Sequence, residues 1–129
     1  IRVVARESDI VETVNMRTFW FDVRGDGPFV AQARVKVACA PVGRAVRLDW
    51  LWFDGEMGLG DRLDYGLCDA AGSITFERTL RMPHGTDRLR LRTMLGEGPQ
   101  PAEPGEVEAS MELRRDLVSA RDRGARFGG

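Results

Sequence analysis

The sequence predicts an all-β protein, an antiparallel two-sheet β-sandwich of about seven or eight strands. Apolar residues alternate with polar ones at a period of two along most of the chain, and turn signals rich in Gly, Pro and Asp separate these runs. The size agrees, because 129 residues with 43% hydrophobic content suit one ordinary globular core. A small closed β-barrel is the alternative arrangement of the same strands.

The clearest elements lie on either side of a Gly-rich turn at residues 24–28. Residues 19–23 carry apolar side chains at every second position before the turn, and residues 29–39 do the same after it. Because both apolar rows keep one parity and face one core, we expect a hairpin. A short strand at residues 2–5 precedes them.

The strand expected over residues 46–53 is apolar on both faces near its end. Trp50 and Trp52 share the parity that we assign to the core, whereas Leu51 and Phe53 point the other way. Either a second layer covers Leu51 and Phe53, or they are exposed and available to a partner.

Four more alternating runs follow, at residues 63–67, 74–82, 89–95 and 107–113. We assign the apolar row of each run to the core, although the second run breaks phase at Arg78. The last run also contains good helix formers, so a helix is the alternative there, but strict alternation favours a strand.

One domain is expected over residues 1–114, followed by a charged C-terminal tail at residues 115–129. Residues 96–105 are rich in Pro and Gly, lack periodicity and predict an extended surface loop within the domain. No apolar run approaches the roughly 20 residues that span a bilayer, so we expect no membrane partner.

Cys39 and Cys68 are too close in sequence for the disulfide of an immunoglobulin domain. Cys39 shares the parity of the core row that precedes it, whereas Cys68 falls out of phase with Leu63, Tyr65 and Leu67. We therefore expect free thiols, with Cys39 as a small buried hydrophobe. Free thiols favour a reducing compartment, and a cytoplasmic location is the expectation that follows.

Catalytic side chains are scarce, since histidine, lysine and tyrosine occur once each, at His84, Lys36 and Tyr65. His84 lies in an expected turn, and no serine stands in a Gly-x-Ser-x-Gly elbow. We therefore assign no catalytic residue, and an enzyme built on carboxylates and arginines stays an alternative.

The acidic, Gly-rich stretch at residues 54–64 is the place where composition allows a calcium site. Its spacing does not follow the EF-hand loop, and Gly and Asp are also what an ordinary strand connection uses. We therefore expect no cofactor, with calcium as the alternative. The candidate ligands for calcium are Asp54, Glu56, Asp61 and Asp64.

Two groups of residues are candidates for binding a ligand or partner. The first is a row of arginines spaced two apart, which places guanidinium groups on one face of a strand, where they could clamp anionic groups. The second is an outward-facing apolar patch. The row consists of Arg88, Arg90 and Arg92, and the patch of Trp20, Leu51 and Phe53.

The predicted function is binding without catalysis, by an accessory module that mediates protein–protein interaction or assembly, with a protein partner or a second copy as its ligand. A carbohydrate-binding or small-ligand domain that uses the aromatic residues as a platform is the alternative. Nucleic acid is not favoured, because the formal net charge is -1 and aromatic side chains are not interleaved with the arginine row.

Overall fold

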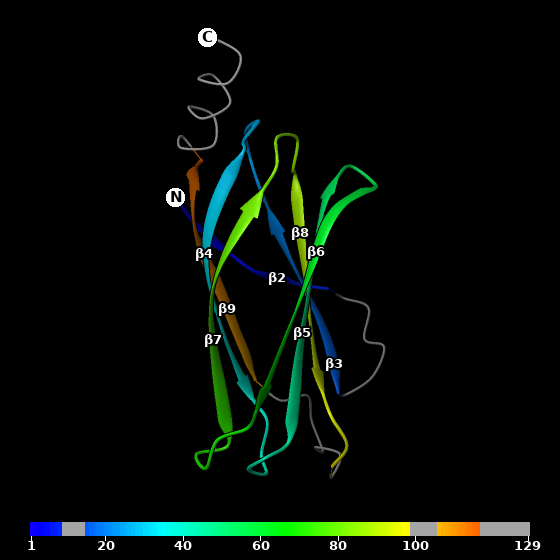
Figure 1. The fold of residues 1–129 in the computed structure, drawn as a ribbon, viewed down its shortest axis with the longest axis vertical. Coiled ribbons are helices and arrows are strands. Elements are labelled where there is room, and N and C mark those ends of the chain that lie inside the picture. The colour runs from blue at the N-terminus through cyan, green and yellow to red at the C-terminus, as the bar shows by residue number, and fades with distance from the viewer. Residues whose placement is uncertain (9–14, 99–105, 117–129) are drawn as a thin grey trace, which may run out of the picture.

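The computed structural model describes residues 1–8, 15–98 and 106–116, and these form two antiparallel β-sheets without a helix. The four-stranded sheet has the order β1-β9-β4-β7 and the five-stranded sheet the order β2-β3-β8-β5-β6. The sheets face each other across one core (Figure 1) and do not close into a barrel, so the predicted sandwich is confirmed and the barrel is wrong. The strands are β1 (Arg2–Val4), β2 (Arg6–Glu7), β3 (Met16–Asp22), β4 (Phe29–Ala38), β5 (Ala45–Asp54), β6 (Met57–Leu67), β7 (Ser73–Met82), β8 (Arg88–Leu95) and β9 (Val107–Arg115).

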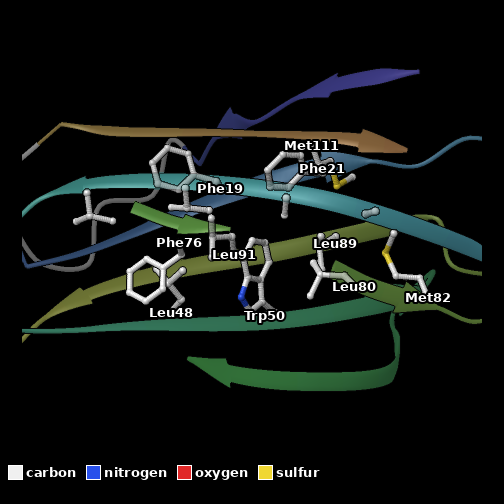
Figure 2. Close-up of a cluster of buried hydrophobic side chains, with 14 of the residues drawn as sticks. Phe19, Phe21, Leu48, Trp50, Phe76, Leu80, Met82, Leu89, Leu91 and Met111 are labelled. Atoms are coloured by element: carbon white, nitrogen blue, oxygen red, sulfur yellow. The ribbon is translucent and has the colours of Figure 1, made fainter. Parts of the chain in front are cut away.

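The core lies between the two sheets, and each long strand contributes every second side chain to it. Trp50 of β5 and Phe21 of β3 are fully buried, and Leu89 of β8 packs beside them (Figure 2). The inward rows of β7, β8 and β9 keep the predicted phases, and residues 107–113 form a strand rather than a helix.

The predicted hairpin between residues 19–23 and 29–39 is wrong. β3 pairs with β8, whereas β4 pairs with β7 and β9, so the chain changes sheet at the Gly-rich turn. Both apolar rows do face one core, but from opposite sheets. Alternation has the same form in two strands that share a sheet and in two strands that face each other, which is why it could not distinguish them.

The inward and outward faces of β6 are exchanged relative to the prediction. Its inner side carries Asp64 and Gly66, which lie at the seam where β6 meets β7. A Cβ atom at Gly66 would collide with the side chain of Ile74 on β7, so the close approach of the two strands requires a glycine there. The apolar row therefore faces outward; it consists of Leu63, Tyr65 and Leu67, which are 46%, 65% and 67% exposed.

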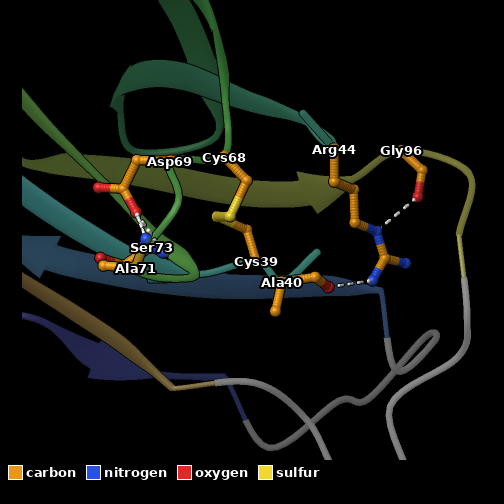
Figure 3. Close-up of a disulfide and its surroundings, with 8 residues drawn as sticks. All are labelled: Cys39, Ala40, Arg44, Cys68, Asp69, Ala71, Ser73 and Gly96. Carbon is orange, nitrogen blue, oxygen red and sulfur yellow. Dashed lines mark hydrogen bonds between the residues drawn. A yellow bond between two sulfur atoms is a disulfide. The ribbon is translucent and has the colours of Figure 1, made fainter. Parts of the chain in front are cut away.

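Cys39 and Cys68 form a disulfide (Figure 3), so the prediction of free thiols is wrong. Because β6 turns its even-numbered residues inward, Cys68 follows the buried phase and meets Cys39 just beyond the end of β4, with the two Cα atoms 5.7 Å apart. The bond joins the two sheets. Beside it, the buried Arg44 donates hydrogen bonds to the carbonyl oxygens of Gly96 and Ala40. Because both cysteines are paired, they give no reason to expect a cytoplasmic location.

The C-terminal strand continues slightly beyond residue 114. β9 ends at Arg115, and the carboxylate of the buried Asp116 accepts a hydrogen bond of 3.2 Å from Arg81. Residues 99–105 of the predicted loop and residues 117–129 of the predicted tail lie outside the described residues. Over the part of the chain that is described, no helix is long and apolar enough to cross a membrane.

Candidate ligand-binding face

The structure brings all six predicted binding residues onto the outer face of the five-stranded sheet. They come from three neighbouring strands, β3, β8 and β5, and each is half-buried. Arg90 lies between Trp20 and Leu51 in the strand register, and Arg88 lies opposite Phe53. We call this surface the arginine–aromatic face; it consists of Trp20, Leu51, Phe53, Arg88, Arg90 and Arg92, together with Leu63, Tyr65 and Leu67 of β6.

Trp20, Phe53 and Arg88 form a compact cluster at one end of this face. The ring centroids of Trp20 and Phe53 are 5.8 Å apart, and the guanidinium carbon of Arg88 lies 5.0 Å from the first ring and 5.5 Å from the second. Arg88 also donates a hydrogen bond to the carbonyl oxygen of Gly55 in the β5–β6 turn. Cation–π contact and this hydrogen bond hold the cluster together.

Arg90 and Arg92 continue the cationic row along β8, at intervals of about 7 Å for two residues of a strand. The guanidinium carbon of Arg90 lies 5.8 Å from the centroid of the Phe53 ring. Arg92 stands opposite Asp49 of β5 in the strand register. The arginine row therefore lies between aromatic and aliphatic groups and two carboxylates, with Asp49 opposite Arg92 and Asp22 opposite Arg88.

The outward row of β6 was missed by the sequence reasoning, which assigned Leu63, Tyr65 and Leu67 to the core. The row lies beside β5, and the guanidinium carbon of Arg47 is 6.0 Å from the Tyr65 ring centroid. A signal was present in the sequence, since Cys68 shares the parity of the inward residues of β6. If Cys68 had been assumed to pair with Cys39, its parity would have predicted which face of β6 is buried.

The outer face of the four-stranded sheet has a different character. Arg34 of β4 stands opposite Glu77 of β7, and Lys36 stands opposite Glu108 of β9, all with exposed side chains. Charges of opposite sign on neighbouring strands are typical of a solvated sheet face. The apolar surface is thus concentrated on the other sheet.

Asp64 holds a buried ion network at the seam between β6 and β7. Its carboxylate, in a residue 8% exposed, accepts hydrogen bonds from Trp50 Nε1 at 3.1 Å, from Arg78 Nε at 2.8 Å and from Arg62 Nε at 3.2 Å. Burial raises the pKa of Asp64, but hydrogen bonds from Arg78 and Arg62 and the charges of these arginines outweigh it, so the pKa is lowered. Arg78, which broke the predicted phase of its strand, is thus an inward charge with a partner.

The network also affects whether a further strand can pair with this edge of the sandwich. β6 and β7 are edge strands of their sheets, and both turn charged side chains inward beside the core. Inward charges at an edge discourage the addition of a further strand.

The four candidate calcium ligands are not brought together. Asp54 and Glu56 lie at the β5–β6 turn, whereas Asp61 points outward from β6 and Asp64 points inward. The oxygens of Asp64 accept hydrogen bonds from Trp50 and the two arginines. Among residues 1–8, 15–98 and 106–116, no group of three or more His, Cys, Asp and Glu side chains is placed to hold a metal ion.

A separate groove of about 670 Å³ lies where the chain passes from β1 to β2. Charges of both signs line it, among them Arg34, Lys36 and Glu7. The side chain of Arg17 donates a hydrogen bond of 2.8 Å to Glu7, which lowers the pKa of that carboxyl against the opposing effect of burial. None of the predicted binding residues lines this groove.

Comparison with solved structures finds β-sandwich domains of low sequence identity. One is the C-terminal CBM6 of a marine laminarinase from Zobellia galactanivorans, with 13% identity, a TM-score of 0.43, and coverage of 88% of this chain and 94% of that chain. Another is a Clostridium thermocellum endo-1,4-beta-D-xylanase 10B fragment with its CBM22-1 and GH10 modules, complexed with xylohexaose, at 12% identity and a TM-score of 0.44. The second match covers 90% of this chain and 25% of the xylanase chain. No protein-family model and no curated protein sequence matches the chain.

Proposed function

We propose that this chain is a β-sandwich binding module and that it takes a protein partner on the arginine–aromatic face. The observation that carries the proposal is the exposed apolar row of β6, which shares this face with the half-buried Leu51 and Phe53 of β5. Contiguous apolar surface bordered by polar groups is typical of interaction sites. Arginine and aromatic side chains are also enriched among the residues that dominate binding energy at protein interfaces.

The free energy available from burying the β6 row supports the same proposal. Tyr65 and Leu67 expose about two thirds of their surface, and burial of such a side chain contributes about 1–2 kcal/mol. The three residues of the row together would therefore supply a few kcal/mol to a complex. The charged outer face of the other sheet offers no comparable gain.

Substitution of Leu67 tests the proposal. Peptides are selected from a random display library on the immobilised chain, and their affinities are measured for the wild type, for Leu67→Asp and for Val4→Asp. Val4 is the matched control, because it is 69% exposed but lies on the other sheet. We expect binding to Leu67→Asp to weaken by about tenfold, the effect of losing 1.4 kcal/mol, and binding to Val4→Asp to stay unchanged.

Sedimentation of the purified chain, with Phe53→Arg beside it, tests whether the partner is a second copy. Self-association that is lost in Phe53→Arg would support the proposed face with the chain as its own ligand. Peptides that bind equally to the wild type and to Leu67→Asp would overturn the proposal.

Carbohydrate binding is a second candidate, favoured by the Trp20–Phe53 ring pair with the guanidinium group of Arg88 against both rings. Aromatic rings offer apolar surface to a sugar ring, and guanidinium groups donate to its oxygens. Laminarin and xylan are suitable probes in affinity electrophoresis. Sugar binding predicts retardation that is lost in Trp20→Ala and kept in Leu67→Asp, whereas a protein partner predicts no retardation.

A further inference from the structure

We infer that the groove beside β9 binds an extended, uncharged peptide segment, which adds to the four-stranded sheet as a further strand next to residues 107–109. The inference goes beyond the proposed function, because this site lies at the opposite edge of the sandwich from β6 and binds through the backbone. Its basis is an unpaired stretch of β9 that coincides with a cavity.

β1 leaves the first part of β9 without a neighbouring strand. β1 pairs with β9 from Glu112 to Ser110, and after Val4 the chain passes to the other sheet as β2 (Figure 1). β9 itself begins at Val107. Among the residues that the structure describes, no strand pairs with residues 107–109 on this side, a stretch of about 10 Å.

The backbone groups of Val107 and Ala109 point toward the unpaired side. Further along β9, the N–H of Leu113 donates to the carbonyl oxygen of Ile1, in the line of β1. Odd-numbered residues of β9 therefore direct their N–H and C=O groups to this side, whereas even-numbered residues bond to β4. An added strand would find the N–H groups of both residues and the carbonyl oxygen of Val107 in ladder geometry.

The cavity of about 670 Å³ lies on this same stretch, since residues 107–110 of β9 line it. Its volume is within the range of about 300–1,000 Å³ that is typical of ligand pockets. Ala5 and the Phe19 ring of β3 also line it. Side chains of an added strand that lie beside Val107 and Ala109 would point inward with them and meet Ala5 and Phe19, so the site favours small apolar side chains at alternate positions.

The charges around the groove are matched within the chain, which is why we assign an uncharged segment. Each charged residue that lines the groove bonds to a residue of opposite sign or stands opposite one in the register: Glu7 with Arg17, Arg2 with Glu112, Arg34 with Glu77 and Lys36 with Glu108. The inward side chains of β9 here, Val107 and Ala109, are apolar and pack against the core. This stretch therefore lacks the inward charges that discourage strand addition at the β6 and β7 edges.

Capped peptides of about six residues that alternate Val and Thr test the inference with the full chain. In an extended peptide, successive residues direct their N–H groups to opposite edges, so N-methylation of Val alone or of Thr alone removes the donors of one edge. Fluorescence anisotropy compares the two methylated peptides with the parent. We expect one of them to bind about tenfold more weakly and the other to bind like the parent. Loss on methylation of Val indicates an antiparallel strand, and loss on methylation of Thr a parallel one.

Amide hydrogen exchange of the wild-type chain locates the added strand. Without peptide, the N–H groups of Val107 and Ala109 should exchange faster than that of Glu108, which faces β4. A saturating concentration of the parent peptide should slow exchange at Val107 and Ala109 about tenfold and leave Glu108 unchanged. Because this measurement needs no substitution, it tests the inference whether or not a variant folds.

A pair of variants at Val107 provides the matched control in the chain. Val107→Pro removes one N–H that faces the groove, at the first residue of an edge strand, where proline is tolerated. Val107→Ala shortens the side chain and keeps the N–H. We expect the peptide to bind Val107→Pro about tenfold more weakly and Val107→Ala within about threefold of the wild type. Thermal unfolding of both variants verifies that they are folded.

The outcomes separate this inference from the proposed function. Binding that is kept in Leu67→Asp and depends on one set of N–H groups supports strand addition, even if the arginine–aromatic face takes no partner. Binding that Leu67→Asp abolishes would place the peptide on that face and overturn the inference. Equal affinities of both methylated peptides, or no binding at millimolar concentration, would overturn it too. Self-association that Val107→Pro removes would identify a second copy as the occupant instead of an unlike peptide.

Discussion

Asp64 joins the two sheets through side chains from three strands. Trp50 belongs to β5, Arg62 to β6 and Arg78 to β7, and all three donate to the one carboxylate. Removal of one member of a buried ion network leaves the others without compensation. The residue therefore has a structural effect much larger than that of an ordinary surface aspartate.

Substitution Asp64→Asn should lower the free energy of unfolding by about 1–2 kcal/mol, because Arg62 and Arg78, whose side chains are 41% and 30% exposed, lose a charged hydrogen-bond acceptor. Asp61→Asn is the matched control on the same strand, and its outward position predicts a change within about 0.5 kcal/mol. Urea unfolding at neutral pH measures both. Similar losses in the two variants would contradict the assigned role of Asp64.

The lowered pKa of Asp64 makes this contribution dependent on pH. A carboxyl whose pKa is lower in the folded state contributes stability above its unfolded pKa, near 4, and the contribution is lost as pH falls through the folded value. The stability advantage of the wild type over Asp64→Asn should therefore persist at neutral pH and shrink below about pH 4. Urea midpoints of both proteins across this range provide the measurement. A stability advantage of the wild type that stays constant to low pH would contradict the predicted contribution of the Asp64 charge.

β6 shows how an edge strand can present its apolar side chains to solvent. Its inner side must accommodate β7 and the indole of Trp52, and glycines at positions 60 and 66 leave the necessary space. The outer side is then free to carry Leu63 and its neighbours. Packing demands on one side of the strand thus account for the unusual exposure on the other.

Gly60→Ala tests this account at the level of the strand. A Cβ atom there would lie 2.7 Å from Trp52 Nε1 and 2.8 Å from Cε2, so the indole would have to move, at a cost of about 1–3 kcal/mol. Gly58→Ala is the control, since its Cβ would make an ordinary contact of 3.8 Å with Leu51. Guanidinium unfolding followed by tryptophan fluorescence compares the two, and an equal stability of both variants would show that β6 tolerates a side chain under Trp52.

The whole sandwich is tied at one end by the Cys39–Cys68 disulfide, which closes a loop with a sequence separation of 29. A loop of this length predicts a stabilisation of about 3–4 kcal/mol through restriction of the unfolded chain. The double variant Cys39→Ala/Cys68→Ala and the reduced wild type should both lose this amount in urea unfolding. Two free thiols in the denatured, unreduced protein would contradict the bond.

The disulfide also changes the expectation for the compartment of the whole molecule. Structural disulfides persist in oxidising environments, so we expect the bond to form there and to be absent from protein made in a reducing cytoplasm. Thiol titration of the chain expressed with and without export makes this comparison. Complete oxidation in both compartments would remove the link between the bond and the location.

Local patterning accounted for the β class, the phases of β7, β8 and β9, and the outward positions of Trp20, Leu51 and Phe53. These properties follow from the period of two, which each strand carries within its own residues. The sandwich could be predicted from that period, whereas the arginine row and the aromatic patch share a face because β3 and β5 both pair with β8.

The segments with which each strand or cysteine pairs could not be predicted from this period. The change of sheet between β3 and β4, the turned-over phase of β6 and the Cys39–Cys68 bond all depend on which segments meet in space. Leu63 and its neighbours look like core residues in sequence, and the contacts of β7 with the inner side of β6 place them on the surface. A strand's alternation specifies two faces, and contacts with residues distant in sequence select the one that is buried.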